Sequence, residues 1–329
     1  MKYGRHWLLL GAFALQCGTT ACGTVTYAPN DPLSPLKLQQ AIELPDTNGR
    51  IDHLAVDVGG SRLFVAEVAN GSLDIIDLSS GRVVRHVSGL SEPQGVGWLP
   101  VQREIVVACG DGSVRFYDAA GKRQVAKLDL GSDADNVRVD PRNGHIVVGY
   151  GSGGLAVIDP ATHSELRKVT FRGHPEGFRL VEGLALVNVP DDGAVLSVNI
   201  DDGRVIARWP TGLRRLNFPM VVNPDGRSIT IAYRLPATLQ RIDIETGRAL
   251  ASYSACGDAD DLFMVGERTL IVCGAGSVGV VENDKLSALV KTRGGARTGL
   301  YIPELKTLFV ALPPARGSPA AIWAFRVRP

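Results

Sequence analysis

Short apolar runs alternate with turn-forming residues along most of the chain. From residue 51 onward one unit recurs: an apolar strand, a turn, a β-branched strand, a glycine-containing loop, a further strand and an Asp-x-x-x-Gly turn. The segments that show it most plainly are LFVAEVANGSLDIIDLSSGRVV, IVVACGDGSVRFYDAAGKRQV and IVVGYGSGGLAVIDPATHSEL. Apolar runs of this length between closely spaced turn signals indicate antiparallel strands. No helical periodicity accompanies them.

The spacing of this unit predicts the fold. The residue that closes the third strand of each unit recurs at intervals of 41, 41, 40, 44, 39 and 44 residues. Those residues are Asp77, Asp118, Asp159, Asn199, Asp243, Glu282 and Arg326. Seven repeats with four short strands each predict an all-β, seven-bladed β-propeller. A pair of packed β-sandwiches, the alternative, does not explain the constant period.

The last repeat predicts how the ring closes. Residues 300–329 have room for only three strands, and the segment KLQQAIEL at residues 37–44 precedes the first repeat. If this segment supplies the missing strand, it joins the two ends of the domain and removes two exposed sheet edges. We therefore expect residues 37–329 to form one domain.

The N-terminal residues have the pattern of an export signal. A short basic stretch precedes the apolar run Trp7–Leu15, which is too short to span a bilayer, so residues 1–22 are expected to be a signal peptide. Cys22 follows Thr-Thr-Ala and resembles a lipoprotein cleavage box, so the chain is either lipidated at Cys22 or simply cleaved. Residues 23–36 are then expected to form an extended tether. The predicted location is the periplasm or cell envelope, with a lipid anchor in the outer membrane as the only membrane contact.

The repeats resemble a known family of propellers. The phrases RIDHLAVD, EPQGV, DADNVRVD, GHPEGF, NFPM, DADDLF and GARTGL fall at the blade junctions, over residues 37–329. They are similar to those of the YVTN-type, or YncE-like, family of exported bacterial proteins. The resemblance implies the propeller fold but no particular reaction, because the family shares none. Some members are thought to bind single-stranded DNA.

Composition argues against several functions. Lys and Arg number 35 against 34 Asp and Glu, a net charge of +1, which argues against a nucleic-acid partner. With 45% hydrophobic residues the chain is expected to be globular. The chain has no C-x-x-C-H, G-x-S-x-G, H-E-x-x-H or P-loop motif, so covalent haem, a hydrolase elbow, a zincin and a P-loop nucleotide site lack support.

Polar residues recur at the start of each repeat. One column contains Asp52, Gln94, Asp135, Glu176, Phe218, Asp260 and Thr298. The next column adds His53, Asn136 and Asp261, and Arg50, His174 and Arg297 lie just upstream. In a propeller the loops that lead into the first strands open on one face. These columns therefore predict a polar, acid-lined mouth of the central channel.

Converging carboxylates need a counter-charge or raised pKa values. The counter-charge could come from Arg50 and Arg297, from a basic ligand, or from a divalent cation. A metal site would use Asp52, Asp135, Glu176 and Asp260. Oxygen ligands suit Ca²⁺ or Mg²⁺, whereas the addition of His53 and His174 would favour Zn²⁺. Alternatively, these acids only cap turns by accepting backbone N–H groups.

Three cysteines lie beyond the signal region. Cys256 precedes the sixth repeat and Cys273 ends its second strand, and both project towards the same face, so a disulfide between them is geometrically possible. The alternative is that these two and Cys109 are buried, inert thiols.

Two functions remain open. The first is a monomeric, non-catalytic propeller that binds a small molecule or a periplasmic protein at the channel mouth. The second is a metal-dependent lactonase or related hydrolase that uses a cation bound in the channel. The sequence favours binding, because no paired acid and nucleophile stands out.

Overall fold

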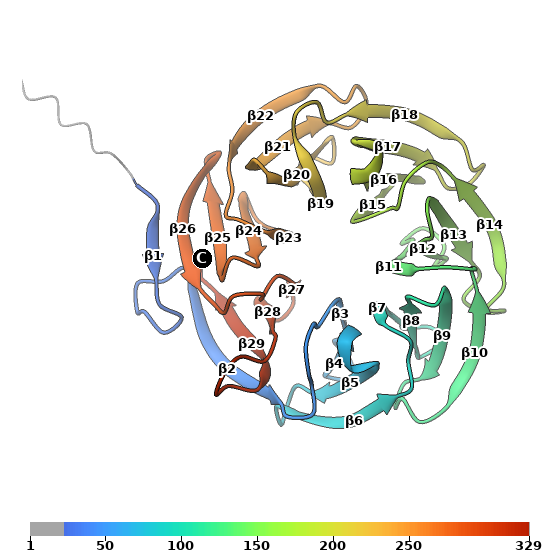
Figure 1. Cartoon of the computed structure of the whole chain (residues 1–329), viewed down its shortest axis with the longest axis horizontal. Coiled ribbons are helices and arrows are strands. Elements are labelled where there is room, and N and C mark those ends of the chain that lie inside the picture. Colours follow the sequence, from blue (N-terminus) through green and yellow to red (C-terminus); the bar gives the residue numbers. More distant parts are fainter. Residues whose placement is uncertain (1–22, 329) are drawn as a thin grey trace, which may run out of the picture.

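The chain forms a ring of seven β-sheets around a central channel (Figure 1). The computed structural model describes residues 23–328, so the predicted signal peptide and the Cys22 lipidation site lie outside the described residues. Each blade is built on four antiparallel strands, in chain order in six blades and with one strand from the N-terminal part of the domain in the seventh, which confirms the predicted seven-bladed propeller. Within residues 23–328 the helical elements are two short 3₁₀ turns, η1 (Val68–Asn70) and η2 (Pro190–Asp192). No helix in this part of the chain has the length and apolar character needed to cross a membrane.

The blades follow one another along the chain, each with its first strand nearest the channel (Figure 1). Blades 1 and 2 comprise β3 (Leu54–Asp57), β4 (Arg62–Glu67), β5 (Ser72–Asp77) and β6 (Arg82–Ser88), then β7 (Pro93–Leu99), β8 (Glu104–Cys109), β9 (Ser113–Asp118) and β10 (Gln124–Asp129). Blades 3 and 4 comprise β11 (Ala134–Val139), β12 (Ile146–Tyr150), β13 (Gly154–Ile158) and β14 (Glu165–Thr170), then β15 (Phe178–Val181), β16 (Leu184–Val189), β17 (Ala194–Asn199) and β18 (Val205–Pro210). Blades 5 and 6 comprise β19 (Arg215–Val222), β20 (Ser228–Leu235), β21 (Ala237–Asp243) and β22 (Ala249–Ser254), then β23 (Ala259–Val265), β24 (Arg268–Cys273), β25 (Ser277–Glu282) and β26 (Lys285–Lys291).

Blade 7 closes the ring with a strand from the other end of the domain. It combines β27 (Gly299–Ile302), β28 (Thr307–Leu312) and β29 (Ala320–Val327) with β2 (Leu36–Leu44). β2 runs antiparallel to β29, with pairs from Leu36–Val327 to Leu44–Ala320, so the predicted closing strand is confirmed.

The segment before the closing strand lies against the propeller. Residues Val25–Tyr27 form β1, which pairs in parallel with β26 and adds a fifth strand to blade 6. Tyr27 packs against the apolar cluster between blades 6 and 7. Residues 23–36 were predicted to be a tether, but the structure docks part of them. The physical reason is that the outer strand of a blade exposes unpaired backbone groups that a short extended segment can satisfy.

The core lies between neighbouring blades. The second strand of each blade is mostly buried on both faces, as in β4, where five of six residues are buried. Phe64 and Leu73 of blade 1, for example, pack against Val96 and Ile105 of blade 2. Outer strands such as β6 are mostly exposed instead, and Val87 is the one buried residue of β6. This packing fixes the first strands around the channel and holds their N-terminal ends together at one mouth.

Candidate functional site at the channel mouth

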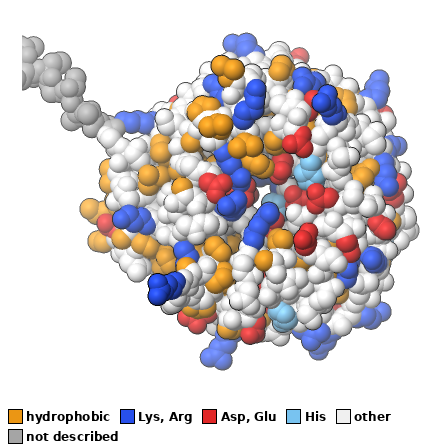
Figure 2. All heavy atoms as spheres, in the orientation of Figure 1, with side chains coloured by type: hydrophobic (Ala, Val, Ile, Leu, Met, Phe, Trp, Pro, Cys, Tyr) orange, Lys and Arg blue, Asp and Glu red, His pale blue; other side chains and the backbone are white. Residues whose placement is uncertain are grey.

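The starts of the inner strands enclose a small polar cavity of about 40 Å³. Figure 2 shows acidic, basic and histidine side chains gathered around the central opening. Eight of the residues predicted for this mouth line the cavity: Arg50, Asp52, His53, Asp135, Asn136, Glu176, Asp260 and Asp261. Phe218 of the same column and its neighbours Gly177 and Pro219 complete the lining, together with Arg138 and Arg179, which sequence reasoning did not assign to it.

Arginines neutralise one side of the mouth. Arg50 forms an ion pair with Asp52. Arg234 pairs with Asp260 and lies 3.1 Å (Nε to Oδ1) from Asp258, and the NH2 group of Arg297 lies 3.0 Å from the other oxygen of Asp258. These acids therefore have a counter-charge from the chain itself.

Arg234 was missed by sequence reasoning. It lies near the end of β20, a second strand, whereas the aligned columns cover only the starts of first strands. Its guanidinium lies 4.0 Å from the ring centroid of Phe218, the residue that replaces an acid in the blade 5 position of the column. A cation placed over an aromatic face is attracted by the ring. The one signal in the sequence that pointed to a cation here was therefore Phe218, the apolar residue in an otherwise polar column.

On the other side of the mouth the acids face histidines, and no described arginine forms an ion pair with them. Asp135 is buried, and its Oδ1 atom has no hydrogen-bond partner. Nε2 of His53 lies 3.7 Å from that oxygen, and Nε2 of His174 lies 3.9 Å from Oδ2. Among residues 23–328, no group donates a hydrogen bond or forms an ion pair with the Glu176 carboxylate. Asp135 and Glu176 are thus acids with unused acceptor capacity.

Burial controls the protonation of the mouth. It raises the pKa of Asp52 to about 7 and that of Glu176 to about 8, and in both the negative charge of Asp135 acts in the same direction. Burial also raises the pKa of Asp260 to about 7, against the opposing effect of Arg234. At neutral pH this cluster therefore retains protons, which a cation entering the mouth would displace.

The histidines and Asp135 are affected differently. Burial lowers the pKa of His53, so this imidazole stays neutral near pH 7. Burial acts in the same direction on His174, but Asp135 and the Gly151 carbonyl outweigh it and raise the pKa of His174 to about 9. Burial alone would raise the pKa of Asp135, yet the neighbouring His174 and His53 hold it below its usual value. Asp135 is therefore the most readily ionised of the four column acids.

The turn-capping interpretation fails for the four column acids. Within the described part of the chain, no backbone N–H donates to Asp52, Asp135, Glu176 or Asp260. Asp261 differs, because the N–H of Gly299 donates to its Oδ2 atom over 2.8 Å. Four side chains are therefore acidic for a reason other than local turn geometry.

Several predicted residues lie outside the cavity. Nε2 of Gln94 donates to Asp133 over 2.9 Å, and Arg297 pairs with Asp258. Thr298 is buried and donates to the carbonyl of Ile51, which ties blade 7 to blade 1. His174 reaches Asp135 but is not part of the cavity lining. The cavity is therefore narrower than the full set of aligned positions suggested.

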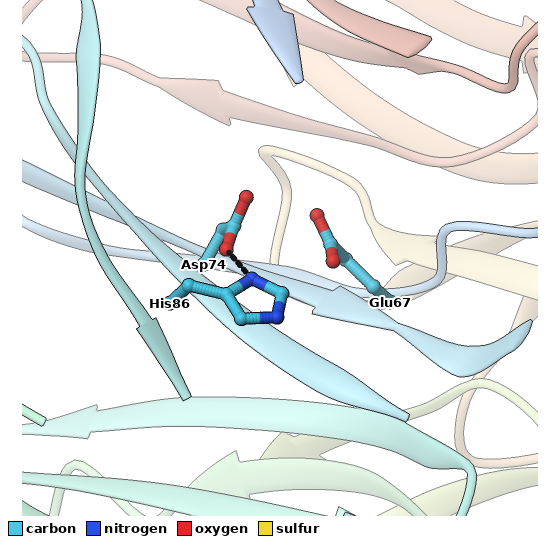
Figure 3. A group of neighbouring side chains, drawn as sticks. All are labelled: Glu67, Asp74 and His86. Atoms are coloured by element: carbon cyan, nitrogen blue, oxygen red, sulfur yellow. Dashed lines mark hydrogen bonds and ion pairs between the residues drawn. The ribbon is translucent and has the colours of Figure 1, made fainter. Parts of the chain in front are cut away.

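A different group has the compact geometry that metal ligands need. Among the described residues, one set of three potential ligands has all its atoms within 4.8 Å of one another: Glu67, Asp74 and His86 in blade 1. Figure 3 shows the Glu67 carboxylate facing the Asp74–His86 pair, in which Nδ1 and Oδ1 are 2.7 Å apart. The Glu67 oxygens already accept hydrogen bonds from Thr47 and Ser72, among others. We therefore interpret this group as an internal hydrogen-bond network that joins strands β4, β5 and β6 of blade 1.

The structure also joins Cys256 and Cys273 in a disulfide, the pairing that their positions suggested. It links the loop before β23 to the end of β24, next to the rim of the mouth. Cys109 is a buried free thiol.

No family model matches the chain, and no curated protein matches it. The function therefore has to be argued from the mouth itself.

Proposed function

We propose that this chain is an exported, non-catalytic propeller of the YncE-like kind that binds a small ligand or a periplasmic protein at its acid-lined channel mouth. The observation that carries the proposal is the pair Asp135 and Glu176. The buried Asp135 oxygen without a donor costs free energy, and the charge of Asp135 repels the nearby, half-buried Glu176 carboxylate. A ligand that brings N–H donors and a positive charge would relieve both costs.

The size of the cavity limits what can enter it. A volume of about 40 Å³ holds a few water molecules, or one ammonium or guanidinium group, but not a whole substrate. The proposed ligand is therefore a primary amine, or a basic side chain of a protein partner, whose remaining atoms lie on the surrounding face. The near-neutral charge of the chain gives no support to a nucleic acid in this role.

The alternative, a metal-dependent hydrolase, has less support. It requires at least three ligand atoms that converge on one ion. The column acids do not form such a group, and Asp52 and Asp260 are engaged by arginines. A Ca²⁺, Mg²⁺ or Zn²⁺ ion would have to displace those arginines.

Export is part of the proposal. It rests on the basic and apolar pattern of residues 1–22, with either lipidation at Cys22 or simple cleavage, and it places the protein in the periplasm or cell envelope. The Cys256–Cys273 disulfide supports it, because such bonds persist in oxidising compartments.

The experiment uses protein exported to the periplasm and measures its thermal unfolding at pH 8.5 with N-acetyl-lysine amide or the uncharged N-acetyl-norleucine amide. We expect only the lysine compound to raise the unfolding temperature. The increase should shrink in Glu176→Gln and Asp135→Asn. It should persist in Glu304→Gln, an exposed acid far along blade 7.

Parallel measurements with CaCl₂, MgCl₂ and ZnCl₂ test the alternative. A chelator-reversible increase with one of these salts, lost in Glu176→Gln, would favour the hydrolase. An equal response to the lysine and norleucine compounds would refute binding of a basic group at the mouth.

A further inference from the structure

The channel opens at its other end into a second, larger cavity of about 450 Å³. Its lining residues lie further along the same inner strands, as Val56 follows His53 and Phe263 follows Asp261. The walls are mainly apolar and include Val56, Val96, Trp98, Val137, Phe263 and Leu300. Four residues line both this cavity and the acidic one: His53, Arg138, Arg179 and Asp261. They form the layer that separates the two ends of the channel.

The two arginines of this layer have no acidic partner. Among residues 23–328, neither Arg138 nor Arg179 forms an ion pair with a carboxylate. Arg138 donates to the carbonyls of Val137 and Phe178 and to the side chain of Asn136. Its guanidinium is therefore held in place by its surroundings.

The guanidinium of Arg179 makes fewer hydrogen bonds than that of Arg138. Its one hydrogen bond to a described residue joins NH1 to the carbonyl of Phe178 over 2.9 Å, although a guanidinium carries five N–H donors. Burial and the nearby positive charge of Arg138 lower the pKa of Arg179 to about 9. A half-buried cation that is short of acceptors, and is repelled by Arg138 as well as attracted by Asp261, would be stabilised by an anion.

We propose that this second cavity binds a small monocarboxylate with an apolar body, whose carboxylate group is received by Arg179 and Arg138. The planar fork of a guanidinium matches a carboxylate and binds it through two parallel hydrogen bonds. The walls formed by Trp98 and Phe263 would cover the hydrocarbon part. A cavity of this volume, mostly apolar with a few polar groups that orient the ligand, is typical of small-molecule sites.

The charge balance favours a single negative charge. Two arginines and the Asp261 carboxylate give the layer a net charge of +1, because His53 is neutral near pH 7. A monocarboxylate neutralises that charge, whereas a dianion would leave an excess in a desolvated place. The site shares this layer with the acidic mouth, but its ligand is recognised by the arginines and the apolar walls rather than by Asp135 and Glu176.

The test uses the unaltered, exported protein and calorimetric titration with acetate, benzoate, 3-phenylpropionate and benzamide. We expect benzoate to bind more tightly than acetate, 3-phenylpropionate at least as tightly as benzoate, and the uncharged benzamide at least about tenfold more weakly than benzoate. Arg179→Met should weaken benzoate binding about tenfold or more. Arg316→Met, at an exposed arginine outside the channel, should leave it unchanged.

Three results would overturn the proposal. The first is equal affinity for benzoate and benzamide, which would show that the arginines do not contribute. The second is competition by inorganic phosphate as strong as that by benzoate, which would show that the apolar walls do not contribute. The third is unchanged benzoate affinity in Arg179→Met. The ligand series on the unaltered protein decides the matter even if that variant fails to fold.

Discussion

Removing the buried side chains of the closing strand β2 should unfold the propeller. Leu36, Ile42 and Leu44 are each at most 1% exposed. Leu36 packs in the cluster between blades 6 and 7, whereas Ile42 and Leu44 pack between blades 7 and 1. The strand therefore contributes to both interfaces that hold the last blade.

The magnitude follows from this burial. Replacing a fully buried leucine or isoleucine by alanine costs about 2–5 kcal/mol, from lost apolar transfer and the cavity left behind. The three replacements together should cost about 6–15 kcal/mol if they add. A whole domain is stable by only about 5–15 kcal/mol. Each single variant should therefore fold with reduced stability, and the triple variant should be largely unfolded.

The assay is equilibrium unfolding in guanidinium chloride, followed by tryptophan fluorescence and near-ultraviolet circular dichroism. The matched control is Glu43→Ala, an exposed position on the same strand that pairs with Ala321 and should change stability by at most about 0.5 kcal/mol. A second control deletes residues 23–27, which removes β1, where only Tyr27 is partly buried. If the triple variant unfolds at the same midpoint as Glu43→Ala, or if the β1 deletion costs as much as Ile42→Ala, the closing strand does not stabilise the ring as argued.

Three further predictions follow. The unliganded protein should lose stability as the pH rises from about 4.5 to 8, because an acid whose pKa is raised on folding stabilises the protein only while it is protonated. In Glu176→Gln the unfolding temperature should therefore change less with pH over this range. Arg234→Met should lower the free energy of unfolding by about 3 kcal/mol, because it leaves Asp260 as a buried charge without its partner, and Arg234→Met combined with Asp260→Asn should recover part of the loss; no recovery would contradict the pairing. Reduction of the disulfide, or Cys256→Ser with Cys273→Ser, should cost about 3 kcal/mol for a bridge across 17 residues; unchanged denaturation midpoints would contradict it.

The fold was predictable because it repeats. Residues such as Asp77 and Asp118 were expected to end third strands, and β5 and β9 end there. The closing strand was predictable because blade 7 lacked a partner strand. β1 was not, because three residues that pair with the outside of a blade carry no periodic signal. Its position depends on an edge that only the assembled propeller creates.

The site was predictable only in part, for a related reason. Alignment of the repeats brings Asp52, Asp135 and Asp260 to one mouth because equivalent positions in a ring lie at equal heights. It says nothing about side chains that reach the mouth from another strand, as Arg234 does. Nor does it show how much room the side chains leave, and that decides which ligands can enter.

The layer between the two cavities explains why neither end of the channel neutralises the other. Asp135 has an oxygen without a donor, and Arg179 in the shared layer makes one hydrogen bond with its five N–H donors, yet the two do not pair. Arg138 could bridge them, but its hydrogen bonds to Val137, Phe178 and Asn136 hold it to the walls. A protein that only needed a stable channel would gain by joining these opposite charges. Their separation leaves an unmet acceptor at the mouth and unmet donors in the layer between the cavities, as the two proposed sites for a cation and an anion would require.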